Sequence, residues 1–247
     1  MHAVVPILMS STFLIPFSTT FLIFVLATKL SIMLKNFETF SIPKMSGSRS
    51  CAVIDLDATL VHIWGDETDW YLVEGEERPK AVDRLVDIRF DRDFMWGTRR
   101  PHTDDFLEAC FSCFDVVGVW SAGVAPYVNE IVEEVFIARG FKPHFTWSKT
   151  ECVKTYHEES RQQIYQKPLT KLYNKIGNID SNRTLLFDDN LWACEQDPLN
   201  HVLLPPWCGD MKTLHFDDDA LLRLSKWIEQ KVAPAENYKM LSLKGVF

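Results

Sequence analysis

Two aspartates separated by one residue follow an apolar run near residue 55. The run Cys51 to Leu56 leads into Asp55, Asp57 and the hydroxyl of Thr59. A carboxylate can attack phosphorus to form an aspartyl-phosphate, which splits one difficult displacement into two easier ones. A second carboxyl two residues further on can protonate the departing alkoxide and later take a proton from water. The pair therefore predicts phosphoryl transfer, and the alternative is two solvated acids in a surface turn.

Three more polar positions lie where later elements are expected to end or begin. They are Ser121, Lys167 and the pair Asp188 and Asp189. Open α/β sheets place ligands at the carboxyl ends of their strands, so we expect Ser121 and the acidic pair to converge with Asp55. Each also has an ordinary interpretation: a loop serine, a solvated lysine at a helix start, and acids that cap a helix.

Taken in order, these segments resemble the RNA polymerase II C-terminal-domain phosphatase family, also called NLI-interacting-factor-like, of the haloacid dehalogenase superfamily. The resemblance covers about residues 50 to 228. It rests on a D-x-D-x-T signature and four further segments, Arg100-Pro101-His102-Thr103-Asp104-Asp105-Phe106-Leu107, Val119-Trp120-Ser121-Ala122, Gln166-Lys167-Pro168-Leu169 and Leu186-Phe187-Asp188-Asp189-Asn190. An isolated D-x-D-x-T is moderate support, whereas the ordered set is strong.

The resemblance implies a role for each position. Asp55 would be the nucleophile and Asp57 the acid and base, while Ser121 would donate a hydrogen bond to a phosphoryl oxygen. A phosphate dianion near four aspartates needs compensating cations, which Mg²⁺ and Lys167 would supply. The metal ligands would be the Asp55 carboxylate, the Asp57 main-chain carbonyl and Asp189, with Asp188 orienting Lys167 or the waters of the metal.

Some segments depart from the family pattern, and these concern the substrate more than the reaction. Trp120-Ser121-Ala122-Gly123 stands where the family commonly has Phe-Thr-Ala-Ser, and Lys149-Thr150-Glu151-Cys152 only loosely resembles an arginine-containing stretch near the site. The segment 63–95 has little resemblance in detail. Recognition of the polymerase tail is therefore the weakest part of the comparison.

The elements that must position these residues alternate along the chain. Apolar runs at Cys51 to Leu56, Asp115 to Trp120 and Thr184 to Phe187 are typical of buried strands. Amphipathic stretches predict helices from Thr103 (as the capping residue), from Ala125 to Ala138, and from Asp217 to Val232. This pattern predicts an α/β fold of the haloacid-dehalogenase-like, Rossmannoid type, with a mostly parallel central sheet flanked by helices and a small inserted β-rich segment at about 63–95.

The first 44 residues differ from the rest. From Ala3 to Thr28 no residue is charged, and residues 17–34 are apolar enough for a membrane helix. The cations that follow predict a cytosolic catalytic domain if this anchor is real. The alternative is a misassigned start, with translation from Met45 giving a cytoplasmic or nuclear protein. We expect the catalytic domain at 45–232 and a C-terminal tail at 233–247.

Composition narrows the function classes. The formal net charge of −8 and the lack of a basic run make nucleic acid an unfavoured partner. Six irregularly spaced cysteines favour a reducing compartment, and the lone pair Cys110 and Cys113 is typical of packing on an apolar helix face. The sequence indicates no oligomeric state.

The sequence thus predicts a Mg²⁺-dependent phosphatase of phosphoserine or phosphothreonine in a protein, with the polymerase tail as one candidate substrate. One alternative keeps the chemistry but acts on a small phosphometabolite or a nucleic-acid end. Another is a membrane-tethered binding protein that has lost catalysis, although a scaffold has no need of both Asp55 and Asp57.

Overall fold

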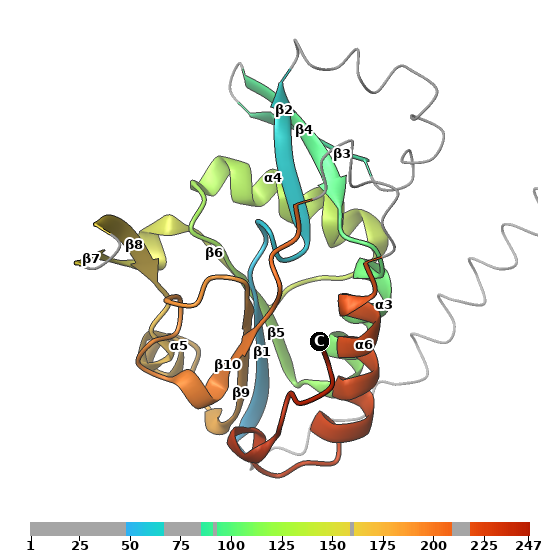
Figure 1. Ribbon diagram of the computed structural model, residues 1–247, viewed down its shortest axis with the longest axis vertical. Coiled ribbons are helices and arrows are strands. Elements are labelled where there is room, and N and C mark those ends of the chain that lie inside the picture. The colour runs from blue at the N-terminus through green and yellow to red at the C-terminus, as the bar shows by residue number, and fades with distance from the viewer. Residues whose placement is uncertain (1–47, 67–84, 91–92, 159–160, 209–217) are drawn as a thin grey trace, which may run out of the picture. The chain divides into compact units, whose positions relative to one another are not determined.

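The computed structural model describes residues 48–66, 85–90, 93–158, 161–208 and 218–247 (Figure 1). At its centre is a five-stranded sheet of order β10-β9-β1-β5-β6, and every strand pair in it is parallel. The strands are β1 (Arg49–Ile54), β5 (Val116–Trp120), β6 (Phe145–Trp147), β9 (Ile179–Asp188) and β10 (His201–Leu203). The α/β class with a parallel central sheet is confirmed.

The central strands are buried on both faces because their side chains alternate between two apolar layers. Ala52 and Ile54 of β1 belong to a large core cluster, whereas Cys51 and Val53 belong to a smaller one on the opposite face. The larger cluster is covered by α3 (Thr103–Cys113), α4 (Ala125–Val135) and α6 (Ala220–Trp227), and the smaller one by α5 (Leu169–Ile176). Cys110 is buried in the larger cluster, with Cys113 packed partly buried against it.

The helix boundaries correct the sequence predictions in detail. Thr103 is the first residue of α3 rather than its cap, and its hydroxyl donates to the carbonyl of Arg100 at 2.7 Å. The capping position is taken by His102, in the left-handed region at φ 62°. Helix α4 ends at Val135 and a 3-10 turn, η2 (Ile137–Arg139), follows. Helix α6 continues as a π-helical segment, η5 (Ile228–Val232).

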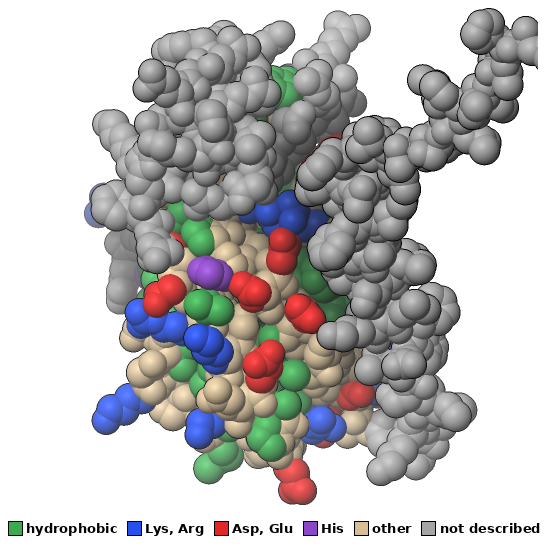
Figure 2. Space-filling model, turned by 90° about the vertical axis from the view of Figure 1, so that its right-hand side faces the viewer, with side chains coloured by type: hydrophobic (Ala, Val, Ile, Leu, Met, Phe, Trp, Pro, Cys, Tyr) green, Lys and Arg blue, Asp and Glu red, His purple; other side chains and the backbone are tan. Residues whose placement is uncertain are grey.

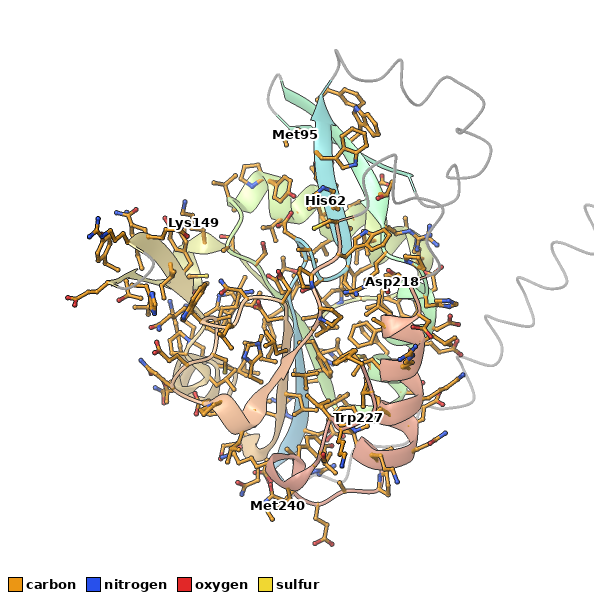
Figure 3. All side chains as sticks on the ribbon, in the orientation of Figure 1. His62, Met95, Lys149, Asp218, Trp227 and Met240 are labelled. Carbon is orange, nitrogen blue, oxygen red and sulfur yellow. The ribbon has the colours of Figure 1, made fainter. Side chains whose placement is uncertain are left out.

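The expected insert contains a three-stranded antiparallel sheet of order β2-β4-β3. Its strands are β2 (Val61–Asp66), β3 (Leu85–Phe90) and β4 (Asp93–Arg99). His62 and Met95 lie on this sheet, away from the end of the molecule that carries Met240 (Figure 3). At Gly97 a Cβ would lie 2.0 Å from the carbonyl oxygen of His62, so this close strand approach requires glycine.

A hairpin that the sequence analysis did not predict lies between β6 and α5. A short 3-10 turn, η3 (Lys149–Glu151), leads into β7 (Val153–His157), which pairs antiparallel with β8 (Gln162–Gln166). Lys149 lies near its base (Figure 3). Strand β8 ends one residue before Lys167, so the hairpin leads directly into the site.

The last residues of the chain pack on the domain. After η5, a 3-10 turn, η6 (Tyr238–Met240), buries Tyr238, and Val246 is also buried. The indole N–H of Trp227 donates to the carbonyl of Ser242 at 3.1 Å. A further 3-10 turn, η4 (Pro198–Asn200), precedes β10.

The proposed membrane segment 17–34 lies outside the described residues. Within the described ranges, no helix has the length and apolar character needed to cross a bilayer.

Candidate active site

Two acids meet because they follow the carboxyl ends of neighbouring strands. Strands β1 and β9 run in parallel register with Ile54 beside Phe187, so Asp55 and Asp188 are neighbours. The N–H of Asp55 donates to the carbonyl of Phe187 at 3.0 Å, and both acids are buried. The parallel pairing of β1 and β9 thus brings together two acids that are 133 positions apart in the sequence.

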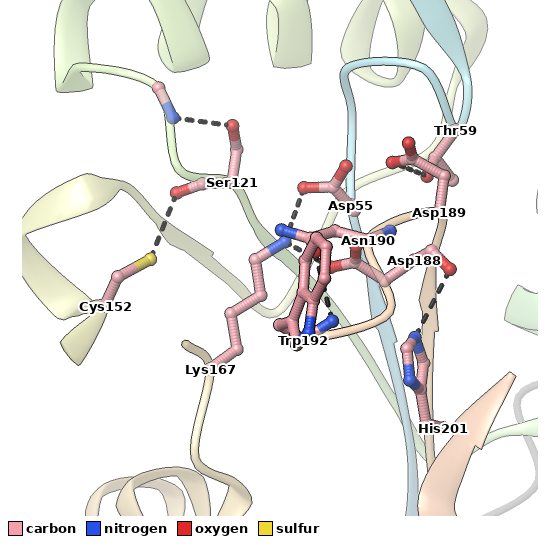
Figure 4. A network of polar contacts seen from close by, with 11 residues as sticks. Asp55, Thr59, Ser121, Cys152, Lys167, Asp188, Asp189, Asn190, Trp192 and His201 are labelled. Carbon is pink, nitrogen blue, oxygen red and sulfur yellow. Dashed lines mark hydrogen bonds and ion pairs between the residues drawn. The ribbon is translucent and has the colours of Figure 1, made fainter. Parts of the chain in front are cut away.

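Lys167 lies between these two carboxylates (Figure 4). Its Nζ is 2.5 Å from Asp55 Oδ1 and 2.6 Å from Asp188 Oδ2, and its side chain is 3% exposed. Burial opposes the charge on Lys167, but the carboxylates of Asp188 and Asp55 outweigh it and raise the lysine pKa. We therefore treat Lys167 as a fixed cation.

Asp189 completes an acidic cluster. One carboxylate oxygen from each of Asp55, Asp188 and Asp189 lies within 4.8 Å of the others. Burial raises the pKa of both Asp55 and Asp189, with the neighbouring Asp188 charge adding to the effect. Three carboxylates beside a single lysine leave an excess of negative charge, and such an oxygen set suits a hard divalent cation. The cluster can therefore hold a metal ion.

Thr59 lies beside this cluster. Its hydroxyl is 3.5 Å from Asp189 Oδ1, at the limit of a hydrogen bond. The neighbouring carboxylate of Asp188 accepts from the backbone N–H of Asn190 at 2.8 Å. These contacts leave Asp188 bound on both sides, because its other oxygen faces Lys167.

Asp57 faces the same pocket as Asp55 but has a different partner. Its carboxylate accepts a hydrogen bond from the phenol of Tyr127, in the first turn of α4. Burial raises the pKa of Asp57, and the Tyr127 hydrogen bond only partly offsets this. A carboxyl that keeps its proton to a higher pH than usual suits a general acid. Coordination of a metal ion by the main-chain carbonyl of Asp57 stays a prediction.

The turn that carries Asp57 is held in a strained conformation. Ala58 has φ 57°, in the left-handed region, which costs an L-residue about 1–2 kcal/mol. Its N–H donates to Val61 O at 2.8 Å, and its carbonyl accepts from the N–H of Trp207 at 2.6 Å. The turn is therefore fixed from both sides.

The guanidinium of Arg100 also holds this turn in place. It is fully buried and binds both carboxylate oxygens of Asp218, at 3.1 and 3.0 Å. It also donates to the carbonyls of Thr59 at 3.4 Å and Pro205 at 2.9 Å. One arginine thus ties the acidic turn to the start of α6 and to the loop after β10, which gives the Arg-Pro segment a positioning role.

Ser121 follows β5 as expected and is buried. Its hydroxyl oxygen accepts from the N–H of Gly123 at 3.0 Å, and its carbonyl accepts from the Cys152 thiol at 3.8 Å (Figure 4). Among the contacts of the described residues, none joins Ser121 to Asp55 or Lys167. Its neighbour Ala122 lines the pocket instead. Its predicted contact with a phosphoryl oxygen stays a prediction.

The acids open into a pocket of about 590 Å³. Asp55, Asp57, Lys167, Asp188 and Asp189 form its floor. One wall comes from β8, with Gln162, Gln163, Ile164 and Tyr165, and another from Asn190, Leu191 and Trp192. The pocket has space for a phosphoryl group together with part of the molecule that carries it.

Sequence reasoning missed three parts of this site. The position of Tyr127 was the one signal for its role, because it lies in the first turn of the helix that follows Ser121 and so near the end of a central strand. The hairpin gave little signal, since β8 has two exposed glutamines, a half-buried tyrosine and a buried glutamine around one buried apolar side chain, Ile164. Trp192 lies three residues after Asp189, and no sequence pattern marked it as part of the site.

Comparison with known proteins gives the site a family context. A family model described as NLI interacting factor-like phosphatase matches residues 50–239. The human CTD small phosphatase-like protein is 26% identical over 201 residues, which cover 78% of this chain and 60% of that protein. The human carboxy-terminal domain RNA polymerase II polypeptide A small phosphatase 2 is 27% identical, with 78% and 61% covered. The aligned part thus spans about 60% of these curated relatives.

Solved structures show the same fold at lower identity. The fission yeast RNA polymerase II CTD phosphatase Fcp1 bound to beryllium fluoride is similar with a TM-score of 0.51 at 16% identity, over 75% of this chain and 51% of that chain. A second structure of Fcp1 gives 0.52, also at 16%, over 75% and 49%. With the family model matched across the domain, the chain belongs to the NLI interacting factor-like phosphatase family of the haloacid dehalogenase superfamily.

Proposed function

We propose that this chain is a Mg²⁺-dependent phosphatase that removes phosphate from phosphoserine or phosphothreonine in a protein, using Asp55 as nucleophile and Asp57 as acid and base. The observation that carries the proposal is the convergence of Asp55, Asp188 and Asp189 around Lys167 at the base of one pocket. Family membership supports the same reaction class.

The proposed reaction has two displacements. In the first, an Asp55 carboxylate oxygen bonds to phosphorus while the bond from phosphorus to the ester oxygen breaks. The departing oxygen keeps the electron pair and takes the proton of Asp57. In the second, the Asp57 carboxylate accepts a proton from water, whose oxygen bonds to phosphorus and releases phosphate, restoring the Asp55 carboxylate.

Each group of the chain has a defined task in this scheme. Lys167 neutralises part of the charge on the phosphoryl oxygens and holds Asp55 in place. Tyr127 orients the Asp57 carboxyl, and Arg100 with Trp207 fixes the turn that carries it. Asp55, Asp188 and Asp189 would hold the metal. When bound, Mg²⁺ supplies Lewis-acid stabilisation of the transferring oxygens.

A phosphoprotein substrate is favoured by the pocket and by the relatives. The pocket extends past the acids along β8 and along an exposed leucine and a half-buried tryptophan, which gives room for more than a small phosphometabolite. Relatives are named as phosphatases of the RNA polymerase II C-terminal domain, so that domain is the first phosphoprotein to test. A nucleic-acid substrate is not favoured, because the charged residues that line the pocket are four aspartates and one lysine. The face of α3 and α6 likewise shows acidic side chains among basic ones (Figure 2).

Phosphate release from a panel of substrates tests the proposal. The panel holds p-nitrophenyl phosphate, phosphoserine and phosphothreonine peptides, sugar phosphates and 3′-phosphorylated oligonucleotides, each with Mg²⁺ or with EDTA. We expect Mg²⁺-dependent release that is highest for phosphopeptides and is lost in Asp55→Asn. Glu133→Gln, on the exposed face of α4, is the matched control and keeps full activity. Phosphate release that persists in Asp55→Asn, or that is unchanged by EDTA, contradicts the proposal.

A further inference from the structure

The edge of β8 that faces away from β7 carries backbone groups directed toward the loop after Asp189. Within the described residues, β7 is the one strand that pairs with β8. The backbone N–H of Lys167, just after β8, donates to Ala193 O at 2.7 Å on the opposite side. Hydrogen-bonding direction alternates along a strand, so the N–H and C=O groups of Tyr165 and Gln163 point to this same outer side.

The pocket itself shows that this edge borders the site. Four consecutive residues of β8, from Gln162 to Tyr165, line it. Side chains alternate between the two faces of a strand, so a pocket that lay against one face would be lined by every second residue. A run of four indicates that the pocket runs along the edge of the strand. The backbone of Tyr165 and Gln163 is therefore accessible from the pocket.

The strand also leads to the reacting groups. Strand β8 ends at Gln166, and the next residue, Lys167, holds Asp55 at 2.5 Å. At about 3.3 Å per residue, Tyr165 and Gln163 lie roughly 7 and 13 Å from Lys167 along the strand. Three to four residues on one side of a phosphorylated residue would span this distance.

The loop after Asp189 offers apolar and aromatic surface. Leu191 is 59% exposed, and Trp192 lines the pocket with its ring 4.9 Å from that of His157 on β7, so this surface lies over one face of the hairpin. An extended peptide added to β8 would direct alternate side chains toward that face. Main-chain hydrogen bonds give affinity in such complexes, and pockets for alternate side chains give specificity.

We propose that the substrate is an extended phosphopeptide segment that adds to the outer edge of β8 as a third strand, with its phosphorylated residue at the Lys167 end. This inference rests on the proposed phosphatase function and specifies its substrate as a segment without tertiary structure, because a folded helix or a small metabolite cannot pair with a strand edge. It predicts that recognition depends on the substrate backbone at every second residue.

The first test changes the peptide and leaves the protein intact. The tightest-binding nonapeptide of a phosphoserine library is resynthesised with a non-hydrolysable phosphonate, and each residue is N-methylated in turn. Binding to the full chain with Mg²⁺ is measured by fluorescence anisotropy. We expect N-methylation to weaken binding tenfold or more at alternate positions on one side of the phosphonate and less than threefold between them.

Other outcomes of this scan contradict the proposal. Effects that are equal at neighbouring positions, or absent on both sides, mean that the peptide does not pair with a strand edge. If no peptide of the library binds with a Kd below about 1 mM, the peptide likewise does not pair with the strand edge. Because this experiment reads binding, it stays separate from the proposed function, which fails if p-nitrophenyl phosphate is not hydrolysed in a Mg²⁺-dependent manner.

A second test removes a backbone donor from the protein. Gln163→Pro deletes an N–H that points outward and leaves the ladder with β7 intact, since proline is tolerated on the free side of an edge strand. Gln163→Ala removes the same side chain but keeps the N–H. We expect the phosphonate peptide to bind the proline variant at least fivefold more weakly than the alanine variant, with thermal unfolding confirming that both fold. Equal binding by the two folded variants overturns the proposal.

Discussion

Lys167 Nζ contacts Asp55 Oδ1 at 2.5 Å and Asp188 Oδ2 at 2.6 Å, so one buried cation joins the ends of two adjacent strands. The side chains of all three residues are at least nine-tenths buried. The lysine is therefore both a structural bridge and the one positive charge that the described chain places at the acidic cluster.

Replacing this lysine is expected to reduce stability and activity together. Lys167→Met leaves buried carboxylates without their partner, which typically costs about 3–5 kcal/mol in free energy of unfolding. Urea denaturation with EDTA should show this loss, and Mg²⁺ should restore part of it by neutralising the same acids. Lys175→Met, which breaks a half-exposed pair with Glu151, is the control and should cost less than about 1 kcal/mol. Equal stability of Lys167→Met and wild type contradicts the bridge.

Removal of the hydrogen bond to Asp57 should change the pH dependence of turnover. Burial raises the pKa of Asp57, and the Tyr127 hydrogen bond holds it lower than burial alone would. Because the protonated form donates to the leaving group, kcat should fall as pH rises through this raised pKa. In Tyr127→Phe the Asp57 pKa rises further, so the falling limb of the plot of kcat against pH should move to higher pH. The kcat for a phosphoserine peptide should be about tenfold lower.

The leaving group separates this effect from a loss of folding. p-Nitrophenolate departs without a proton, so Tyr127→Phe should lower turnover of p-nitrophenyl phosphate much less than that of a phosphoserine peptide. Tyr173→Phe, away from the site in α5, serves as the matched control. An equal loss for both substrates, with an unmoved pH limb, would argue against the pairing of Tyr127 with Asp57.

The conservative substitution Arg100→Lys is expected to lower the free energy of unfolding. Lysine keeps the charge but loses the two-pronged contact with Asp218 and the donors to the turn, so Arg100→Lys should cost about 2 kcal/mol. The exposed i,i+4 pair of Arg223 with Asp219 gives the control, since Arg223→Lys should cost less than about 0.5 kcal/mol. Chemical denaturation of the two variants compares them directly, and equal costs contradict the assigned role.

Metal binding should appear as stabilisation. A ligand that binds the native state alone stabilises it by about 2.7 kcal/mol at a hundred times its Kd. Mg²⁺ should therefore raise the Tm of the wild-type chain by roughly 5–10 °C. Asp189→Asn should lose most of this rise and Glu133→Gln none of it. A rise of the same size in Asp189→Asn excludes Asp189 as a ligand.

The parts of this fold that sequence reasoning reached share one property: a strong local pattern. The apolar runs before Asp55, Ser121 and Asp188 indicated buried strands, and the parallel sheet then requires their ends to meet. Convergence of Asp55 and Asp188 was expected on that ground, and that of Lys167 from its place in the series of family motifs. The structure places the three side chains in contact.

The missed parts depend on tertiary context. The phenol of Tyr127 meets Asp57 only because α4 starts close to the turn after β1, and no periodicity encodes that meeting. Strands β7 and β8 lack a regular apolar alternation, because much of their surface faces solvent or the pocket. Thr103 looked like a cap, but the left-handed His102 takes that position, a choice that depends on local backbone geometry.

The most direct test of the account is to trap the covalent intermediate. The chain is mixed with a saturating phosphopeptide and Mg²⁺, quenched in acid within milliseconds, digested and examined by mass spectrometry. We expect a phosphate that hydroxylamine removes on the fragment containing Asp55, and we expect none in Asp55→Asn. Turnover without a phosphorylated fragment, or phosphate on another residue, would contradict the assignment of Asp55 as the nucleophile.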